Sequence, residues 1–218
     1  ELEHYTGNVW THIISLHRKD AARLGYDNAQ AWCALLRTHR NDIAAAMNIK
    51  PQDFRWYAAF HNEGEHPHVH MMAWSANPGQ AYLSRDGIRQ IKSALTNQIF
   101  KQEMLHLYEQ KSESRDELVR ETRKAMLELS RQMSESVCEH PEAERMILNL
   151  AQQLGEVKGK KSYGYLPKRI KRQVDEIVNQ MEHLPVVDRC YQKWWELQCK
   201  VNAYYSEEER QRPPLSEQ

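Results

Sequence analysis

The sequence lacks several features that would assign a protein to a class at once. Its 218 residues carry no excess of charge, because 30 lysines and arginines balance 30 aspartates and glutamates. A neutral total argues against binding to nucleic acid or membrane through a global field, although local patches survive within it. No apolar run is long enough to cross a bilayer and no signal peptide is recognisable, so we expect a cytoplasmic protein without a membrane segment.

Cysteine is scarce as well. The four cysteines, Cys33, Cys138, Cys190 and Cys199, show no Cys-x-x-Cys spacing. The absence of this spacing argues against a zinc ribbon and a disulfide framework and indicates that the cysteines are reduced thiols. Internal repeats are absent too, and residue 1 is Glu rather than Met, so we expect the chain to be a piece of a longer polypeptide.

Histidine, by contrast, is concentrated. Four of the eleven histidines lie within residues 61–70. An aromatic-rich run over residues 54–60 precedes them, and an apolar run over residues 69–74 overlaps their end and stops at Asn77-Pro78-Gly79. Two such runs joined by a short loop that contains Gly and Pro predict an antiparallel hairpin.

The expected register of this hairpin gathers three of the histidines. If residues 62–67 form the loop, His61 lies opposite His68, and Ala59 lies opposite His70. Strand side chains alternate between faces, and directly opposed residues have Cβ atoms about 4.5–5.5 Å apart. Three imidazoles on one face, with a small alanine among them, predict a metal site with an open position. Such a donor set favours Zn²⁺ or a similar ion, and the alternative is that the histidines are structural.

The loop and the opposite face complete this prediction. Glu63 and Glu65 are candidates for orienting a histidine ring N–H from outside the ligand set, with solvated loop charges as the alternative. His66 is expected to face solvent. The residues that alternate with the histidines form an apolar layer for helices to cover: Trp56, Ala58, Phe60, Val69, Met71 and Ala73.

The rest of the chain predicts one further strand and several helices. A strand is expected over residues 9–16, one amphipathic helix over 28–48, and a helical stretch over 87–136 with a break near 112–114. Later helices are expected to begin near Pro141, near Pro167 and at residue 186, and the tail over residues 210–218 to be loose.

These elements predict an α+β fold with two parts. Residues 1–80 form a strand-helix-hairpin portion, and residues 81–218 form a helical region. Three antiparallel strands with one helix make up part of a ferredoxin-like or RNA-recognition-like sheet.

A second functional signal lies in residues 158–172, which contain seven basic side chains and no acidic one. Basic side chains neutralise phosphates, while aromatic faces stack on unpaired bases. The alternative is a solvated loop that leads into a helix. The candidate DNA-binding residues are Lys160, Lys161, Tyr163, Tyr165, Lys168 and Arg169.

An upstream His61 followed by His68-Val69-His70 resembles the signature of the HUH endonucleases. Within that class, residues 7–16 and the stretch Ser162-Tyr163-Gly164-Tyr165-Leu166-Pro167 are similar to the MobP group of plasmid-mobilisation relaxases. The resemblance implies an HUH endonuclease core and a bacterial enzyme that nicks and rejoins one DNA strand through a phosphotyrosine intermediate. It also implies Mg²⁺ or Mn²⁺ at the three histidines.

The implied partners are single-stranded DNA at an origin of transfer and other relaxosome or conjugation proteins. In such relaxases the nucleophilic tyrosine precedes the first strand, where Tyr5 is the only tyrosine, while other HUH enzymes carry it on a later helix, which nominates Tyr108. The context of Tyr5 does not resemble a nucleophile motif, and the neighbours of Tyr108 suit a half-buried packing role equally well. We therefore expect the nucleophile in sequence beyond this chain. Two other functions stay open: a zinc hydrolase of another class with Glu63 or Glu65 as general base, and a non-catalytic DNA-binding module.

Overall fold

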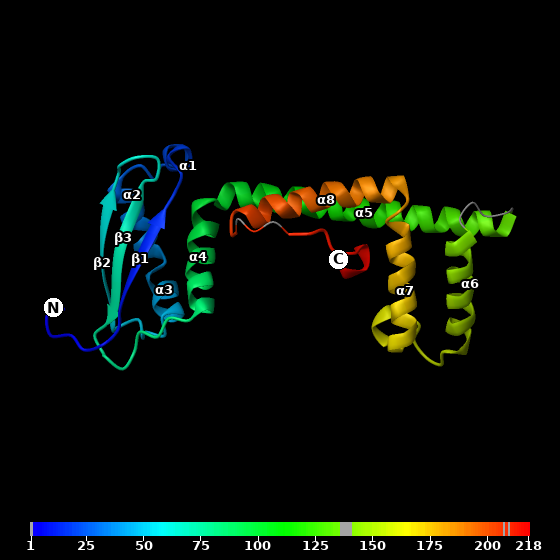
Figure 1. Ribbon diagram of the computed structural model, residues 1–218, viewed down its shortest axis with the longest axis horizontal. Coiled ribbons are helices and arrows are strands. Elements are labelled where there is room, and N and C mark those ends of the chain that lie inside the picture. Colours follow the sequence, from blue (N-terminus) through cyan, green and yellow to red (C-terminus); the bar gives the residue numbers. More distant parts are fainter. Residues whose placement is uncertain (1, 136–140, 207, 209) are drawn as a thin grey trace. The chain divides into compact units, whose positions relative to one another are not determined.

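The computed structural model describes residues 2–135, 141–206, 208 and 210–218 (Figure 1). The chain forms two compact units, residues 1–104 and residues 105–218. The first unit contains a three-stranded antiparallel sheet and helices, and the described part of the second unit is helical. The predicted α+β class is therefore confirmed.

The sheet consists of β1 (Val9–Ser15), β2 (Phe54–His61) and β3 (His68–Ser75), in the order β1-β3-β2. The central strand is therefore the one that carries two of the histidines. The register of the hairpin is the predicted one, with His61 opposite His68 and Ala59 opposite His70.

Four helices belong to the first unit: α1 (Arg18–Leu24), α2 (Ala29–Thr38), α3 (Arg40–Ala46) and α4 (Arg85–Ile99). The prediction of one helix over residues 28–48 is wrong, because the backbone leaves helical geometry at His39, with φ −94° and ψ 14°. The ring of His39 bonds Asp42 at 2.7 Å across the first turn of α3. The separate helix α3 buries Ile43 and Ala44.

The core of this unit covers only one face of the sheet. Alternate residues of the strands, among them Trp10, Trp56 and Phe60, pack against apolar side chains of α2, α3 and α4, and Val69, Met71 and Ala73 of β3 are at most 2% exposed. Ala58 of the edge strand β2, which was predicted to share this layer, is exposed. A Cβ at Gly87 would lie 2.4 Å from the carbonyl oxygen of Ala46, so glycine is what permits α4 to approach α3 this closely. The other face of the sheet carries the alternate residues, including the three histidines.

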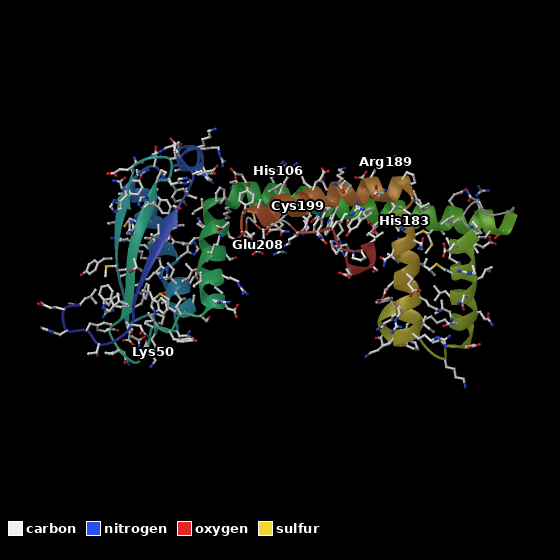
Figure 2. All side chains as sticks on the ribbon, viewed as in Figure 1. Lys50, His106, His183, Arg189, Cys199 and Glu208 are labelled. Atoms are coloured by element: carbon white, nitrogen blue, oxygen red, sulfur yellow. The ribbon has the colours of Figure 1, made fainter. Side chains whose placement is uncertain are left out.

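The second unit is built from the long α5 (Lys101–Glu135), which begins in the first unit, and from α6 (Pro141–Glu156), α7 (Lys168–Met181) and α8 (Pro185–Ala203). Helices α5 and α8 run side by side, and His183 marks the turn between α7 and α8 (Figure 2). The predicted break near residues 112–114 is wrong, because α5 continues there with Ser114 and Leu118 buried on its packed face.

The prediction of a loose C-terminal tail is also wrong. Arg212 donates to Glu182 at 2.8 Å and to Asp188 at 2.9 Å, and the tail ends in the 3-10 turn η2 (Leu215–Glu217). Leu215 of that turn is buried among residues of α5 and α8. Pro213 and Pro214 therefore lead into a packed segment.

Cys33, Cys190 and Cys199 are free thiols, and Cys138 lies outside the described residues. None of the described helices is long and apolar enough to span a membrane.

Candidate metal centre and DNA-binding segment

Strand register brings the three predicted ligands together on the open face of the sheet. The ring centroids of His61 and His68 are 5.2 Å apart, those of His61 and His70 are 5.1 Å apart, and those of His68 and His70 are 5.0 Å apart. His61 is exposed at the end of an edge strand, while His68 and His70 are half-buried on the central strand. The trio is thus a nearly equilateral cluster of rings that solvent reaches from one side.

The hydrogen bond of His68 fixes its tautomer. Its Nδ1 lies 2.8 Å from the carbonyl oxygen of His66, and a carbonyl can only accept, so Nδ1 carries the proton. The lone pair of Nε2 is then free. Metal-binding histidines typically donate their second ring nitrogen to a carbonyl or carboxylate in this way.

The ring positions fit a metal better than the ring orientations do. A point equidistant from the three centroids lies roughly 3 Å from each, close to a metal–nitrogen bond of ~2.1 Å plus the ~1 Å from a ring nitrogen to the ring centre. The described residues nevertheless contain no group of three donor side chains already arranged to hold an ion. The His61 and His68 rings are stacked within 9° of parallel, so one ring must rotate to aim its nitrogen at that point. Backbone register places the three rings on one face, whereas side-chain torsions set the ring angles, so a ring can turn without any change in the strands.

The loop between β2 and β3 places the other predicted residues. Glu63 and Glu65 are exposed, and neither carboxylate bonds a histidine ring within the described part of the chain, so their orienting role stays a prediction. The ring of His66 packs against that of His17 at a centroid distance of 4.8 Å and does not join the cluster of three rings.

Both tyrosine candidates for the nucleophile have other partners, and Tyr5 lies far from the three histidines. Tyr5 donates from its hydroxyl to the carbonyl oxygen of Ser75 at 2.7 Å, at the end of β3 opposite to His68. Seven residues of strand separate these ends, which corresponds to about 23 Å. Tyr108 belongs to α5 in the second unit, where it interacts with Tyr205. Burial, together with this contact, raises the pKa of Tyr205 to about 12.

The predicted DNA-binding segment is largely exposed, and its side chains contact one another and α7. Its two tyrosines lie in the 3-10 turn η1 (Tyr163–Tyr165), directly before α7, and each has a lysine amino group over its ring: Lys171 over Tyr163 at 5.5 Å and Lys160 over Tyr165 at 5.4 Å. Tyr163 also donates to Asp175 at 2.7 Å, and this bond raises the pKa of its hydroxyl. Tyr165 is 70% exposed and is the freer of the two rings.

The comparison with protein families decides the class of the protein. The family of MobL relaxases matches the sequence over residues 1–216. The chain belongs to the MobL relaxase family. The prediction of a relaxase and mobilisation protein is therefore confirmed, and DNA nicking and strand transfer in mobilisation is the activity of this class. Comparisons with curated proteins and with solved structures found no match.

Two features of this MobL relaxase were not predicted from its sequence. Tyr57 lies on the same face of the sheet as the histidines, is 63% exposed, and packs on Trp74 at a centroid distance of 5.5 Å. Tyr57 and His61 are four residues apart in β2, so strand alternation places them on the same face, and this signal in the sequence could have identified Tyr57. Arg18 contacts the loop between the histidines from more than 40 residues away, and no local pattern indicates that contact.

Proposed function

We propose that this chain holds the scissile phosphate in a metal-dependent relaxase, and that His61, His68 and His70 bind one divalent cation for this purpose. The carrying observation is the cluster of three rings about 5 Å apart on an open sheet face in a chain of a relaxase family. On this proposal the sheet is part of an HUH endonuclease core of the ferredoxin or RNA-recognition type.

The residues of the chain would bind and orient. The hydrogen bond from His68 Nδ1 to the carbonyl oxygen of His66 leaves the lone pair of Nε2 available to the cation. Ala59 beside His70 leaves room on the face for a phosphate. When bound, the cation would polarise the phosphate oxygens and stabilise the charge that develops on them. The resemblance to HUH relaxases favours Mg²⁺ or Mn²⁺, whereas the three nitrogen donors favour Zn²⁺.

The proposed reaction is a transesterification. A tyrosine hydroxyl oxygen forms a bond to the scissile phosphorus while the bond from phosphorus to the 3′ oxygen breaks, and the tyrosine proton is passed on to the 3′ oxygen. The products are a 5′-phosphotyrosine and a free 3′-hydroxyl, and the ester keeps the bond energy needed for rejoining. We propose that the tyrosine comes from sequence outside these 218 residues, because Tyr5 is occupied at the far end of β3.

Single-stranded DNA at an origin of transfer is the proposed substrate. The exposed ring of Tyr57 offers a stacking surface on the histidine face. The segment over residues 158–172 supplies cations for phosphates, with Lys160, Lys161, Lys168 and Arg169 all exposed. Other relaxosome or conjugation proteins are the proposed partners in mobilisation.

The test uses the complete reading frame with a supercoiled plasmid that carries its own origin of transfer, in Mg²⁺ or Mn²⁺. We expect relaxation of the plasmid with protein covalently attached to one 5′ end, and loss of both with His68→Ala. A nick with a free 5′ phosphate would identify a hydrolase instead. Origin binding without any nick in the wild-type protein would leave a non-catalytic DNA-binding module.

A further inference from the structure

The loop over residues 62–67 controls how His61 and His68 meet, because His61 ends β2 and His68 begins β3. Except for Pro67, all residues of this loop are exposed. Gly64 adopts a φ of +63°, which other residues rarely accept. An exposed loop of this kind is mobile unless something outside it holds it.

Arg18 holds it. The Nη1 atom donates to Asn62 Oδ1 at 2.5 Å, the Nη2 atom donates to the carbonyl of Gly64 at 2.5 Å and to that of Asn62 at 3.3 Å, and Nε donates to the carbonyl of Gly64 at 3.0 Å. The backbone N–H of Arg18 also donates to the carbonyl of Glu65 at 2.8 Å. One side chain and its own backbone thus engage three successive parts of the loop.

The anchor of this clamp is the core of the first unit. Arg18 is the first residue of α1 and follows β1, whose register continues into the loop through the bond from the N–H of Leu16 to the carbonyl of Pro67 at 3.1 Å. Arg18 forms no ion pair with the described carboxylates. Its planar guanidinium fork instead donates several hydrogen bonds to uncharged oxygens of the loop. A lysine cannot reproduce that fork.

We propose that Arg18 is a positioning residue for the histidine trio. The clamped loop includes the carbonyl oxygen of His66, which accepts from Nδ1 of His68 and leaves the lone pair of Nε2 to bind the ion. Fixing the loop therefore fixes the ring of His68 and its distance from His61. This inference rests on the proposed ion site, and it adds the element that organises the site before the ion arrives.

Charge and positioning predict opposite results when Arg18 is removed. A positive guanidinium near a cation site repels the cation, so by charge alone Arg18→Ala should strengthen ion binding. If Arg18 acts by positioning, the same change should weaken Mn²⁺ binding by about 10–100-fold, the usual loss for a partner behind the ligands. Arg18→Lys keeps the charge without the fork, so we expect it to bind at least as weakly as Arg18→Ala.

The experiment measures Mn²⁺ affinity by calorimetry on the 218-residue chain and its variants, with Lys19→Ala as matched control. Lys19 is the exposed, equally charged neighbour in α1, and its loss should leave affinity unchanged. Amide exchange without metal gives a second readout: Arg18→Ala should speed exchange in residues 62–67 and leave β1 unchanged. Wild-type affinity or tighter in Arg18→Ala overturns the inference while the ion site stands. A wild-type chain that binds no Mn²⁺ overturns both.

Discussion

The two faces of the sheet are made from the same three strands, yet they do different work. On the covered face, Val69 and Met71 are buried against helices. On the open face, their immediate neighbours His70 and Met72 remain accessible. A shift of one position along β3 thus exchanges a residue that holds the fold for one available to a ligand.

This difference explains how a small unit can present the three histidines on one face without weakening its core. Strand alternation separates the two sets of side chains, so the three clustered imidazoles stay out of the apolar core. The backbone ladder that stabilises the sheet also sets the spacing of the three rings. Stability and site geometry therefore share one cause, and substitutions on the two faces should separate them.

The largest effect is expected on the open face, from His68→Ala. Loss of a ligand should weaken the binding of Mn²⁺ or Zn²⁺ by more than the ~10–100-fold typical for a residue that only hydrogen-bonds a ligand. The thermal shift caused by the ion should vanish. His66→Ala is the matched control, because it keeps the carbonyl that accepts from His68 and removes only a ring that packs on His17. A shift that survives in His68→Ala would exclude the three-histidine site.

Adjacent methionines give the most direct comparison of the two faces. Met71 is 1% exposed and Met72 is 39% exposed. Met71→Ala should lower the free energy of unfolding by about 2–5 kcal/mol through lost burial and a residual cavity. Met72→Ala should change it by less than about 0.5 kcal/mol. Equal losses in urea titrations of the two variants would contradict the assignment of a covered and an open face.

Stacking of DNA on the open face should depend on Tyr57. Tyr57→Ala should weaken binding of a single-stranded origin oligonucleotide by about 1–3 kcal/mol, the usual value of one base–aromatic stack. Tyr82 is similarly exposed, at 68%, but lies outside the strands, so Tyr82→Ala is the control. Fluorescence anisotropy measures both variants, and equal affinity in Tyr57→Ala and wild type would remove the sheet face from the DNA path.

The basic segment over residues 158–172 should contribute to DNA affinity through its charge. Neutralising Lys160, Lys161, Lys168 and Arg169 together should make the dependence of affinity on salt shallower, by up to about 3 in the slope of log K against log salt. The same number of changes on α5, at Arg120, Arg123, Lys124 and Arg131, controls for net charge. If the two sets of changes alter the slope equally, the segment has no special place in the interface.

The smallest effect concerns a histidine on the covered face. Burial lowers the pKa of His12 from its ordinary 6.5, and its Nε2 is buried without a hydrogen-bond partner in the described residues. The unfolded chain takes up this proton at higher pH than the folded chain does. Stability from this group is therefore full above pH 6.5 and falls as the pH drops below it. Denaturation between pH 5 and 7 should show this decline in the wild type and a weaker one in His12→Gln.

Alternation and turn residues were sufficient to predict the hairpin, its register and the ring cluster at His61, His68 and His70. All three need only local geometry, since six loop residues fix which positions oppose each other. The break at His39, the continuity of α5 through Ser114 and the packing of the tail on Glu182 were not predictable in the same way. Each depends on a partner that is distant in sequence or on a choice between two acceptable helix geometries.

For this protein, the sequence alone determined which residues alternate on each strand, which residues could bind a metal, and where basic and aromatic side chains gather. These properties follow from the period of the backbone and from the composition of short stretches. Only the tertiary structure decided which helices cover the apolar sheet face and that Arg18 reaches across to the loop beside His61. Such contacts join segments that are far apart in the chain, so they exist only once the core has brought those segments together.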